Sequence, residues 1–213
     1  IATPLLLLID SRLTAKSPAT QAYDALPESA GHVVIAGFGR YGQIVARILR
    51  ARKIPFTALD IDAEQVELVK RFGSEAFFGD ASRPDILQAA KVGDARALVL
   101  AIDDVEASLR IAEFVSAEWP KVLIFGRARN RNHAHRYLDL GITRVQRETF
   151  LSALETTKQL LKGLGDTDRE AERTVKTFRT HDERRLADDY KHYTDMEKMQ
   201  AKARSDAATL EQL

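Results

Sequence analysis

Three glycines that follow a short apolar run constrain the fold of this chain more than any other feature. Residues 32–42 read HVVIAGFGRYG, so Gly37, Gly39 and Gly42 have the G-x-G-x-x-G spacing. In a βαβ unit the first glycine permits the turn off the strand, the second lets the backbone approach a pyrophosphate, and the third lets the helix pack closely on the sheet. The motif therefore predicts a dinucleotide site, with an ordinary strand-to-helix turn as the alternative.

The residues on either side of the glycines favour the nucleotide interpretation. Residues 33–36 are typical of a buried strand, and 41–52 carry an apolar stripe at helical spacing. A helix that begins near Arg40 directs its N–H groups and the positive end of its dipole at a phosphate. A second apolar run, 56–59, ends at Asp60, where a ribose-binding carboxylate is expected. Because a carboxylate there repels a 2′-phosphate, NAD(H) or AMP is favoured over NADP.

Short apolar runs then alternate with helical stripes along the chain. We expect strands at 33–36, 56–60, 75–78, 97–101, 121–125 and 143–146, and helices at 41–53, 62–72, 83–91, 104–118, 130–139 and 149–163. Alternation of this kind predicts an α/β fold, a Rossmann-like doubly wound parallel sheet with helices on both faces, followed by a C-terminal helical extension.

The chain of 213 residues suits one domain of about 150 residues with an appendage. We expect a nucleotide-binding domain at 32–163, preceded at 1–31 by a short apolar run and a linker. That run is too short to span a bilayer, so it is the end of a transmembrane segment or a strand or short helix that covers the domain. Residues 164–213 form a charged helical extension with a narrow apolar stripe, which predicts a partner from the same domain or from a second copy. The stripe consists of Val175, Phe178, Leu186, Tyr190, Tyr193 and Met196.

Composition excludes several classes of site. The net charge of +1 gives no strong field for nucleic acid, so no nucleic-acid partner is expected. The absence of cysteine excludes disulfides and thiolate sites. His133 and His135 lie two residues apart on an expected helix and point to different faces, so no metal site is predicted.

Ligands of such sheets bind beyond the carboxyl ends of the strands, where acidic and basic residues gather in this sequence. Asp60 and Asp62 follow the second expected strand, Gly79, Asp80 and Ala81 the third, Asp103 and Asp104 the fourth, and Arg127 and Arg129 the fifth. Asp80 is either a helix cap or an adenosine contact, whereas Asp103 is better explained as a cap. The arginines, with Arg131, Arg136 and Arg147, form either a solvated surface paired with Asp139 and Glu148 or a second anion site.

A dehydrogenase would need a substrate domain and a proton donor beside the nicotinamide, and the sequence offers neither. The chain is therefore expected to be no enzyme and to have no catalytic residue. The nucleotide is then a regulatory ligand. An NAD-dependent oxidoreductase of unknown substrate stays open as an alternative.

Six ordered motifs carry a resemblance to a known family. They are GFGRYGQ at 37–43, ALDID at 58–62, RFGSEAFFGDAS at 71–82, AIDD at 101–104, RAR at 127–129 and RETF at 147–150. Together they resemble the cytoplasmic RCK/KTN nucleotide-binding domain of Kef-type glutathione-regulated potassium efflux proteins, which are K⁺/H⁺ antiporters. In this light the apolar run at the start is similar to the end of the last transmembrane helix. A regulatory subunit of a Trk-type potassium uptake system stays open as an alternative.

The resemblance implies a homodimer on the cytoplasmic face of the bacterial inner membrane, attached to a transmembrane antiporter domain. It implies a bound NAD(H) or AMP, inhibition by glutathione, activation by glutathione adducts, and for some members a flavodoxin-like quinone reductase as partner. By motif, the nucleotide would lie along Gly37, Gly39, Arg40, Tyr41, Gly42, Asp60, Asp62, Asp80 and Ala81, and glutathione near Arg40, Phe72, Arg127 and Arg129.

Overall fold

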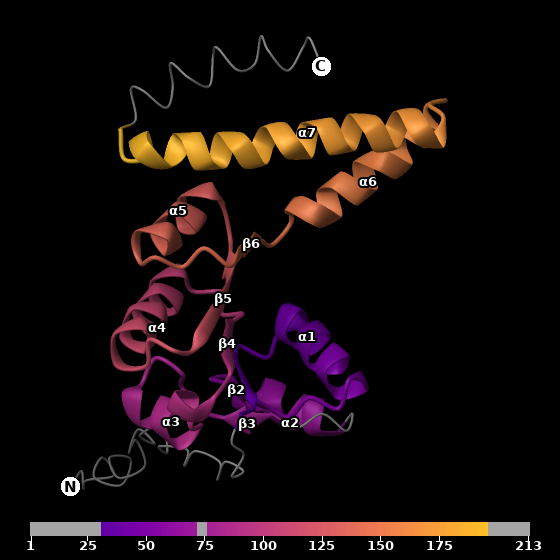
Figure 1. Ribbon diagram of the computed structural model, residues 1–213. Helices are drawn as coiled ribbons and strands as arrows, with labels where there is room; N and C mark the ends of the chain where they lie inside the picture. Colours follow the sequence, from indigo (N-terminus) through magenta and orange to yellow (C-terminus); the bar gives the residue numbers. More distant parts are fainter. Residues whose placement is uncertain (1–30, 72–75, 196–213) are drawn as a thin grey trace, which may run out of the picture.

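The computed structural model describes residues 31–71 and 76–195 (Figure 1). Four expectations lie outside the described residues. They concern the apolar run and linker at 1–30, Phe72, Met196, and the end of the C-terminal extension.

Six strands form one parallel sheet in the order β3-β2-β1-β4-β5-β6. The strands are β1 (Val33–Ala36), β2 (Phe56–Asp60), β3 (Phe77–Phe78), β4 (Ala97–Leu100), β5 (Leu123–Ala128) and β6 (Val145–Arg147). The strand order reverses between β1 and β4, so the crevice at the carboxyl ends of these two strands is the expected ligand position. The Rossmann-like α/β prediction is confirmed.

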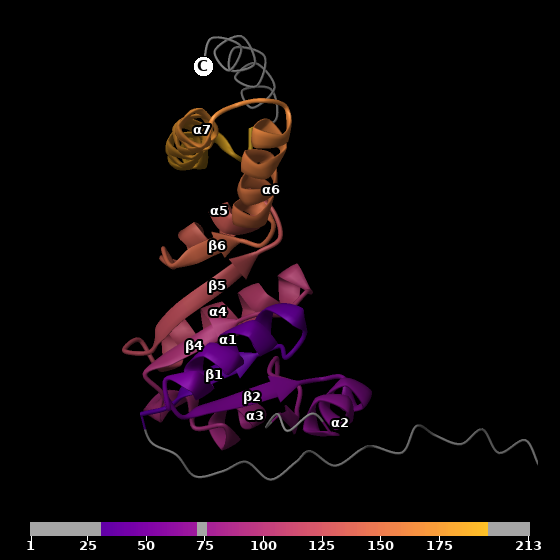
Figure 2. The ribbon, with the colours of Figure 1, turned by 90° about the vertical axis from the view of Figure 1, so that its right-hand side faces the viewer.

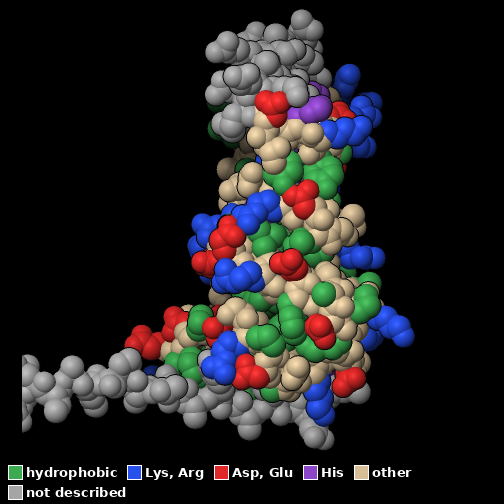
Figure 3. Space-filling view, turned by 90° about the vertical axis from the view of Figure 1, so that its left-hand side faces the viewer, with side chains coloured by type: hydrophobic (Ala, Val, Ile, Leu, Met, Phe, Trp, Pro, Cys, Tyr) green, Lys and Arg blue, Asp and Glu red, His purple; other side chains and the backbone are tan. Residues whose placement is uncertain are grey.

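Helices cover the sheet on both faces (Figures 1 and 2). One face carries α1 (Arg40–Ala51) and α2 (Ala63–Arg71), and the other carries α3 (Pro84–Ala89), the 3₁₀ turn η1 (Val92–Asp94), α4 (Val105–Glu118) and α5 (Arg131–Asp139). The larger apolar core lies under α3, α4 and α5, and the smaller one, which includes Ile35 and Phe38, lies under α1 and α2. Figure 3 shows the face of α3 to α5, where acidic and basic side chains are interspersed.

The fifth strand differs from its prediction at both ends. It begins at Leu123 and continues through Ala128, so Arg127 lies within the strand. The reason is its pairing with β6, in which Gly126, Arg127 and Ala128 oppose Val145, Gln146 and Arg147. An arginine in a central strand requires a buried partner for its charge.

The C-terminal extension is a helical hairpin of α6 (Phe150–Gly163) and α7 (Asp168–Asp189), followed by η2 (Tyr190–His192). A capping box of Thr167 and Glu170 begins α7, and its far end lies against α5 (Figure 1). There Asp182 pairs with both Arg131 and Arg147.

The apolar stripe contributes to this docking at its C-terminal end, where the ring centroids of Tyr190 and Tyr193 lie 6.0 and 4.9 Å from that of His135. Phe178 is exposed, whereas Leu186 packs on the larger core and offers its carbonyl to His135 Nε2 at 2.9 Å. The partner of α7 is thus in part its own domain, through ion pairs. Arg136 of α5, which the sequence grouped with Arg131 and Arg147, pairs with Glu106 of α4.

His133 and His135 are both buried, and they contact different elements. His135 bonds to α7, whereas His133 Nε2 lies 3.1 Å from Ser108 Oγ of α4. Burial, reinforced by the positive charge of Arg136, lowers the pKa of His133 to about 4. The imidazole is therefore neutral at pH 7.

This shift predicts that acid destabilises the fold. Because the unfolded chain takes up a proton near pH 6.5 and folded His133 does so only near pH 4, stability is fully present above pH 6.5 and falls between these values. Between pH 7 and pH 5 the loss is on the order of 2 kcal/mol. Urea unfolding at pH 7 and pH 5 measures it. His133→Gln should flatten this pH dependence, whereas the exposed His192→Gln should not. Equal slopes in all three proteins would contradict the assignment to His133.

Candidate functional site

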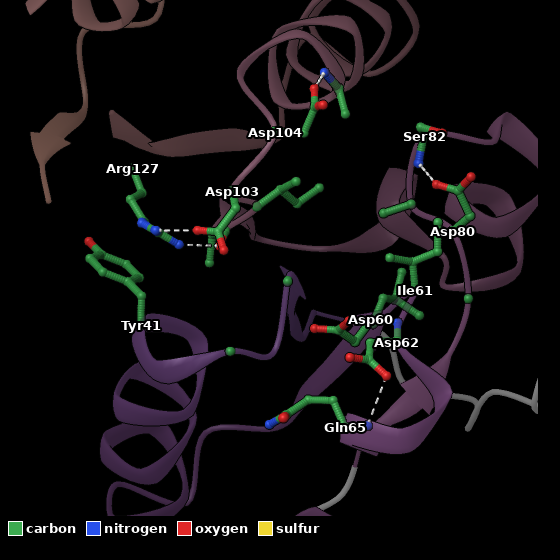
Figure 4. A pocket seen from close by; sticks show the side chains of 18 of the residues that line it. Tyr41, Asp60, Ile61, Asp62, Gln65, Asp80, Ser82, Asp103, Asp104 and Arg127 are labelled. Atoms are coloured by element: carbon green, nitrogen blue, oxygen red, sulfur yellow. Dashed lines mark hydrogen bonds and ion pairs between the residues drawn. The ribbon is translucent and has the colours of Figure 1, made fainter. Parts of the chain in front are cut away.

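A pocket of about 740 Å³ lies at the carboxyl ends of β1, β2 and β4 (Figure 4). Among the residues predicted from sequence, its lining includes Gly37, Gly39, Arg40, Tyr41, Asp60, Asp62, Asp80, Ala81 and Arg127. Gly42 and Arg129 are not part of the lining, and Phe72 is outside the described residues. The sheet thus brings nine candidates together, from β1, β2, β3 and β5 and the loops that follow them.

Two glycines of the motif, Gly37 and Gly42, are required for steric reasons, whereas the third, Gly39, leaves open space. Gly37 has a φ of +95°, and a Cβ there would lie 2.7 Å from the carbonyl carbon of Ala101. A Cβ on Gly42 would overlap the carbonyl oxygen of Gly37, so α1 begins directly against the turn. A Cβ on Gly39 meets nothing within 4 Å. Gly39 is therefore the one of the three whose open space faces the pocket and leaves room for a ligand.

The N-terminus of α1 opens toward this space. Gly39 is its N-cap residue, and among the described residues no side chain caps it or places a carboxylate in its first turn. Its first N–H groups and dipole therefore remain available to an anion. Arg40, the first residue of the helix, is exposed and lines the pocket, which adds a positive charge at the same place.

Asp60 is held at the end of β2 by two backbone donors. Phe38 N donates to Oδ2 at 2.6 Å, and Asp62 N donates to Oδ1 at 2.9 Å. The first bond ties the carboxylate to the glycine turn. Each oxygen keeps further acceptor capacity, so the group can accept hydrogen bonds from hydroxyls such as those of a ribose.

Three other aspartates of the pocket organise loops. Asp62 Oδ1 accepts from Glu64 N and Gln65 N in the first turn of α2. Asp80 Oδ1 accepts from Ser82 N at 2.9 Å, so it stabilises a turn and does not cap α3. Asp104 Oδ1 accepts from Ala107 N at 2.6 Å and caps α4.

Asp103 is not a helix cap, and that expectation is wrong. Its Oδ1 accepts from Arg127 Nη2 at 2.5 Å, and Arg129 Nη1 lies 3.6 Å away. The cap is taken by the next residue, Asp104, and this leaves Asp103 free to turn toward β5. Figure 4 shows Asp103 pointing at Arg127.

Arg127 is nearly buried, with 6% of its side chain exposed. It donates to Ala101 O at 2.7 Å, to Asp103, and to Glu148 Oε2 at 2.8 Å, and its guanidinium lies over the ring of Tyr41. Burial opposes its charge, but the hydrogen bonds to Glu148 and Asp103 outweigh this and raise its pKa. For the hydroxyl of Tyr41, burial disfavours the charged form and so raises its pKa. Arg127 therefore joins three segments of the pocket wall.

Arg129 is more accessible, with 47% of its side chain exposed. It donates to Asp103 O at 3.3 Å and approaches Glu148 at 3.8 Å, which are long contacts. Of the two arginines that were predicted to bind an anion, Arg129 can turn to a ligand with less loss of existing hydrogen bonds.

The pocket has residues that the sequence did not single out. They include Gln43, Ile61, Gln65, Ser82, Ala107 and Arg110. Ile61 could have been found, because it stands between Asp60 and Asp62 at the end of β2 and offers an exposed apolar side chain. Arg110 comes from the second turn of α4, and the strand-end rule does not reach it.

The pocket thus has two chemically different ends (Figure 4). One end carries Asp60, Asp62 and the apolar Ile61, which suits a ribose and an aromatic base. The other carries Tyr41, Arg127 and Glu148. The glycine turn and the start of α1 lie between the two ends, where a phosphate would bind.

Comparison with known families divides the chain into two parts. Residues 33–148 match the TrkA-N domain, and residues 152–213 match the potassium efflux system KefB C-terminal domain. Among the described residues, no helix combines the length and apolarity needed to cross a membrane.

Individual relatives agree with these matches. The glutathione-regulated potassium-efflux system protein KefC of Cronobacter sakazakii is 40% identical over 184 residues, which are 85% of this chain and 30% of that protein. The chain therefore spans less than a third of the length of that relative.

Two solved structures resemble the fold. The Kef C-terminal domain of Shewanella denitrificans in AMP-bound form has a TM-score of 0.69 and 39% identity, over 75% of this chain and 98% of that one. The TrkA-N domain of the inner membrane protein YbaL from Escherichia coli has a TM-score of 0.56 and 22% identity, over 66% of this chain and 100% of that one, and supports the fold alone. The chain therefore belongs to the TrkA-N domain family and is a domain of the Kef type.

Proposed function

We propose that this chain is the regulatory domain of a potassium efflux system and binds an adenine nucleotide, AMP or NAD(H), as a regulatory ligand. The observation that carries the proposal is the uncapped start of α1 beside Gly39, with Asp60 fixed opposite it. Kef-type membership supports the efflux system, and the AMP-bound form of the Shewanella relative supports the nucleotide.

The nucleotide would take the acidic half of the pocket. The phosphate binds at the α1 N-terminus with Arg40, the ribose hydroxyls bond to Asp60, and the base lies by Ile61 and Ala81. The volume of about 740 Å³ exceeds what AMP fills, so the pocket also has room for the longer NAD(H). In this proposal the nucleotide is a ligand that biases conformation and is not turned over.

Glutathione and its adducts would bind near the basic end. Their carboxylates suit Arg129 and Arg40, while Arg127 holds the wall through Asp103 and Glu148. The part of Phe72 in sensing adducts stays a prediction, since the residue lies outside the described segments. The printed name of the KefC relative, a glutathione-regulated system, supports this ligand.

The partners follow from the family. The domain at 32–163 would be attached to a transmembrane K⁺/H⁺ antiporter domain of the same protein and would lie at the cytoplasmic face of the inner membrane. Residues 164–213 would form its charged extension. By family resemblance alone, we also propose a flavodoxin-like quinone reductase as a partner.

The proposed homodimer has a candidate surface on the face of α1. There β5 has no described helix over it (Figure 2), and its Leu123 and Phe125 are exposed. Ile44 and Ile48 of α1 are also exposed. Water contact of four large apolar side chains on one face is costly, and a second copy of the chain would remove it.

Gly39 gives the first test of the nucleotide site. Gly39→Asp should cap α1 with its own carboxylate, keep the fold, and abolish AMP binding by charge repulsion at the phosphate position. Gly39→Ala separates bulk from charge: it should keep the fold, because a Cβ there meets no protein atom within 4 Å, and it should weaken AMP binding less than Gly39→Asp. Calorimetry with AMP measures both. Equal AMP affinity in wild type and Gly39→Asp would refute the position of the phosphate.

Arg129 tests the glutathione site. Arg129→Ala should remove a charged hydrogen bond worth roughly 1.5 to 3 kcal/mol and weaken glutathione binding about ten- to a hundredfold, with AMP affinity unchanged. Arg127→Ala should in addition lower the melting temperature, because Asp103 and Glu148 lose their partner. The exposed Arg173→Ala serves as control. Unchanged glutathione affinity in the Arg129 variant would show that this arginine is a solvated surface residue and does not bind the ligand.

The dimer surface is tested by light scattering. Wild type should have about twice the mass of 23.8 kDa, and Ile48→Asp should be monomeric at equal concentration. Phe178→Asp on α7 should remain dimeric. Dissociation by the Phe178 variant alone would place the interface on the C-terminal extension instead.

A further inference from the structure

Two loops at the basic end of the pocket are linked at the surface by ion pairs. The loop after β4 carries Asp103, and the end of β5 carries Arg127 and Arg129. Asp103 accepts from Arg127 at 2.5 Å and faces Arg129 at 3.6 Å. A ligand anion that draws Arg129 to itself competes with the contacts between Arg129 and Asp103, whereas Arg127 keeps its bonds to Ala101 O and Asp103.

The same two segments are linked a second time in the interior. Arg129 N donates to His133 Nδ1 at 3.2 Å, and His133 Nε2 lies 3.1 Å from Ser108 Oγ. Ser108 Oγ in turn donates to Val105 O at 2.8 Å, in the first turn of α4. Because a backbone N–H can only donate, Nδ1 is the acceptor. The neutral ring therefore carries its proton on Nε2 and donates it to Ser108.

The ring of His133 has little freedom to move. It stacks on Tyr137 with centroids 4.6 Å apart, and its own backbone N–H is bound by Asn130 at 2.9 Å. His133 and Ser108 are both fully buried. No ligand at the pocket can reach this inner link, so it persists when the outer one breaks.

We infer that His133 is a positioning residue for the anion site: together with Ser108 it holds Arg129 at the pocket edge while the ligand replaces Asp103. The inference rests on the proposed binding of glutathione near Arg129. The inference gives the buried pair of His133 and Ser108 a role in the affinity for glutathione. A pair with only a structural role would, when removed, lower the affinity for every ligand and the stability of the fold together.

A double-mutant cycle tests this assignment. Ser108→Ala and His133→Asn both remove the bond between Ser108 and His133, while the Asn oxygen can still accept from Arg129 N. Each should weaken glutathione binding about fivefold, and the double variant should be no weaker than either. AMP affinity should stay within about twofold of wild type, because Asp60 and the α1 N-terminus are untouched. Ser152→Ala on the exposed surface of α6 is the matched control.

Parallel losses of AMP and glutathione affinity, or additive effects in the double variant, would overturn the inference. If the wild type binds AMP but no glutathione, the glutathione proposal is refuted. The positioning of Arg129 by His133 can then still be tested by a separate measurement. In that case hydrogen exchange of the Arg129 amide should be about fivefold faster in Ser108→Ala than in wild type, with the Phe38 amide unchanged. Equal exchange of the Arg129 amide in the two proteins would then reject the positioning role.

Discussion

The approach of α1 to the turn that precedes it is the constraint on which the rest of the site depends. Gly42 lies so close to the Gly37 carbonyl that no side chain fits between them. This contact directs the N–H groups at the start of α1 to the pocket, and the bond from Phe38 N to Asp60 places the carboxylate that we propose to bind ribose opposite them. One backbone turn thus positions both halves of the proposed nucleotide site.

A second determinant is the burial of the positive charge of Arg127. A charge in a central strand is tolerated only with partners, and Asp103 and Glu148 supply them from two other strand ends. The ion pairs therefore connect β4, β5 and β6 at the edge that carries the pocket. If glutathione binds there as proposed, a change of ligand would alter the same contacts that hold this edge together, which would be a physical basis for regulation.

Much of this could be predicted from the sequence, because the governing interactions are local. The glycine motif, Asp60 and the alternation of strands and helices depend on residues close in the chain. The end of β5 could not be predicted from the sequence, because the pairing of β5 with β6 determines where the strand ends. The identity of the α4 cap could not be predicted either, because Asp103 and Asp104 are both suitable residues and the choice depends on the ion pair of Asp103 with Arg127. The docking of α7 depends on Asp182 meeting Arg131 and Arg147, contacts between residues far apart in sequence.

The central claim is that an adenine nucleotide binds with its phosphate at the start of α1 and its ribose at Asp60. Backbone amide NMR of the full chain during titration with AMP tests it most directly. The account predicts the largest shifts at the amides of Phe38, Gly39, Arg40 and Tyr41, with smaller ones at Ile61 and Ala81. Saturable shifts confined to other residues, or none at millimolar AMP, would contradict it.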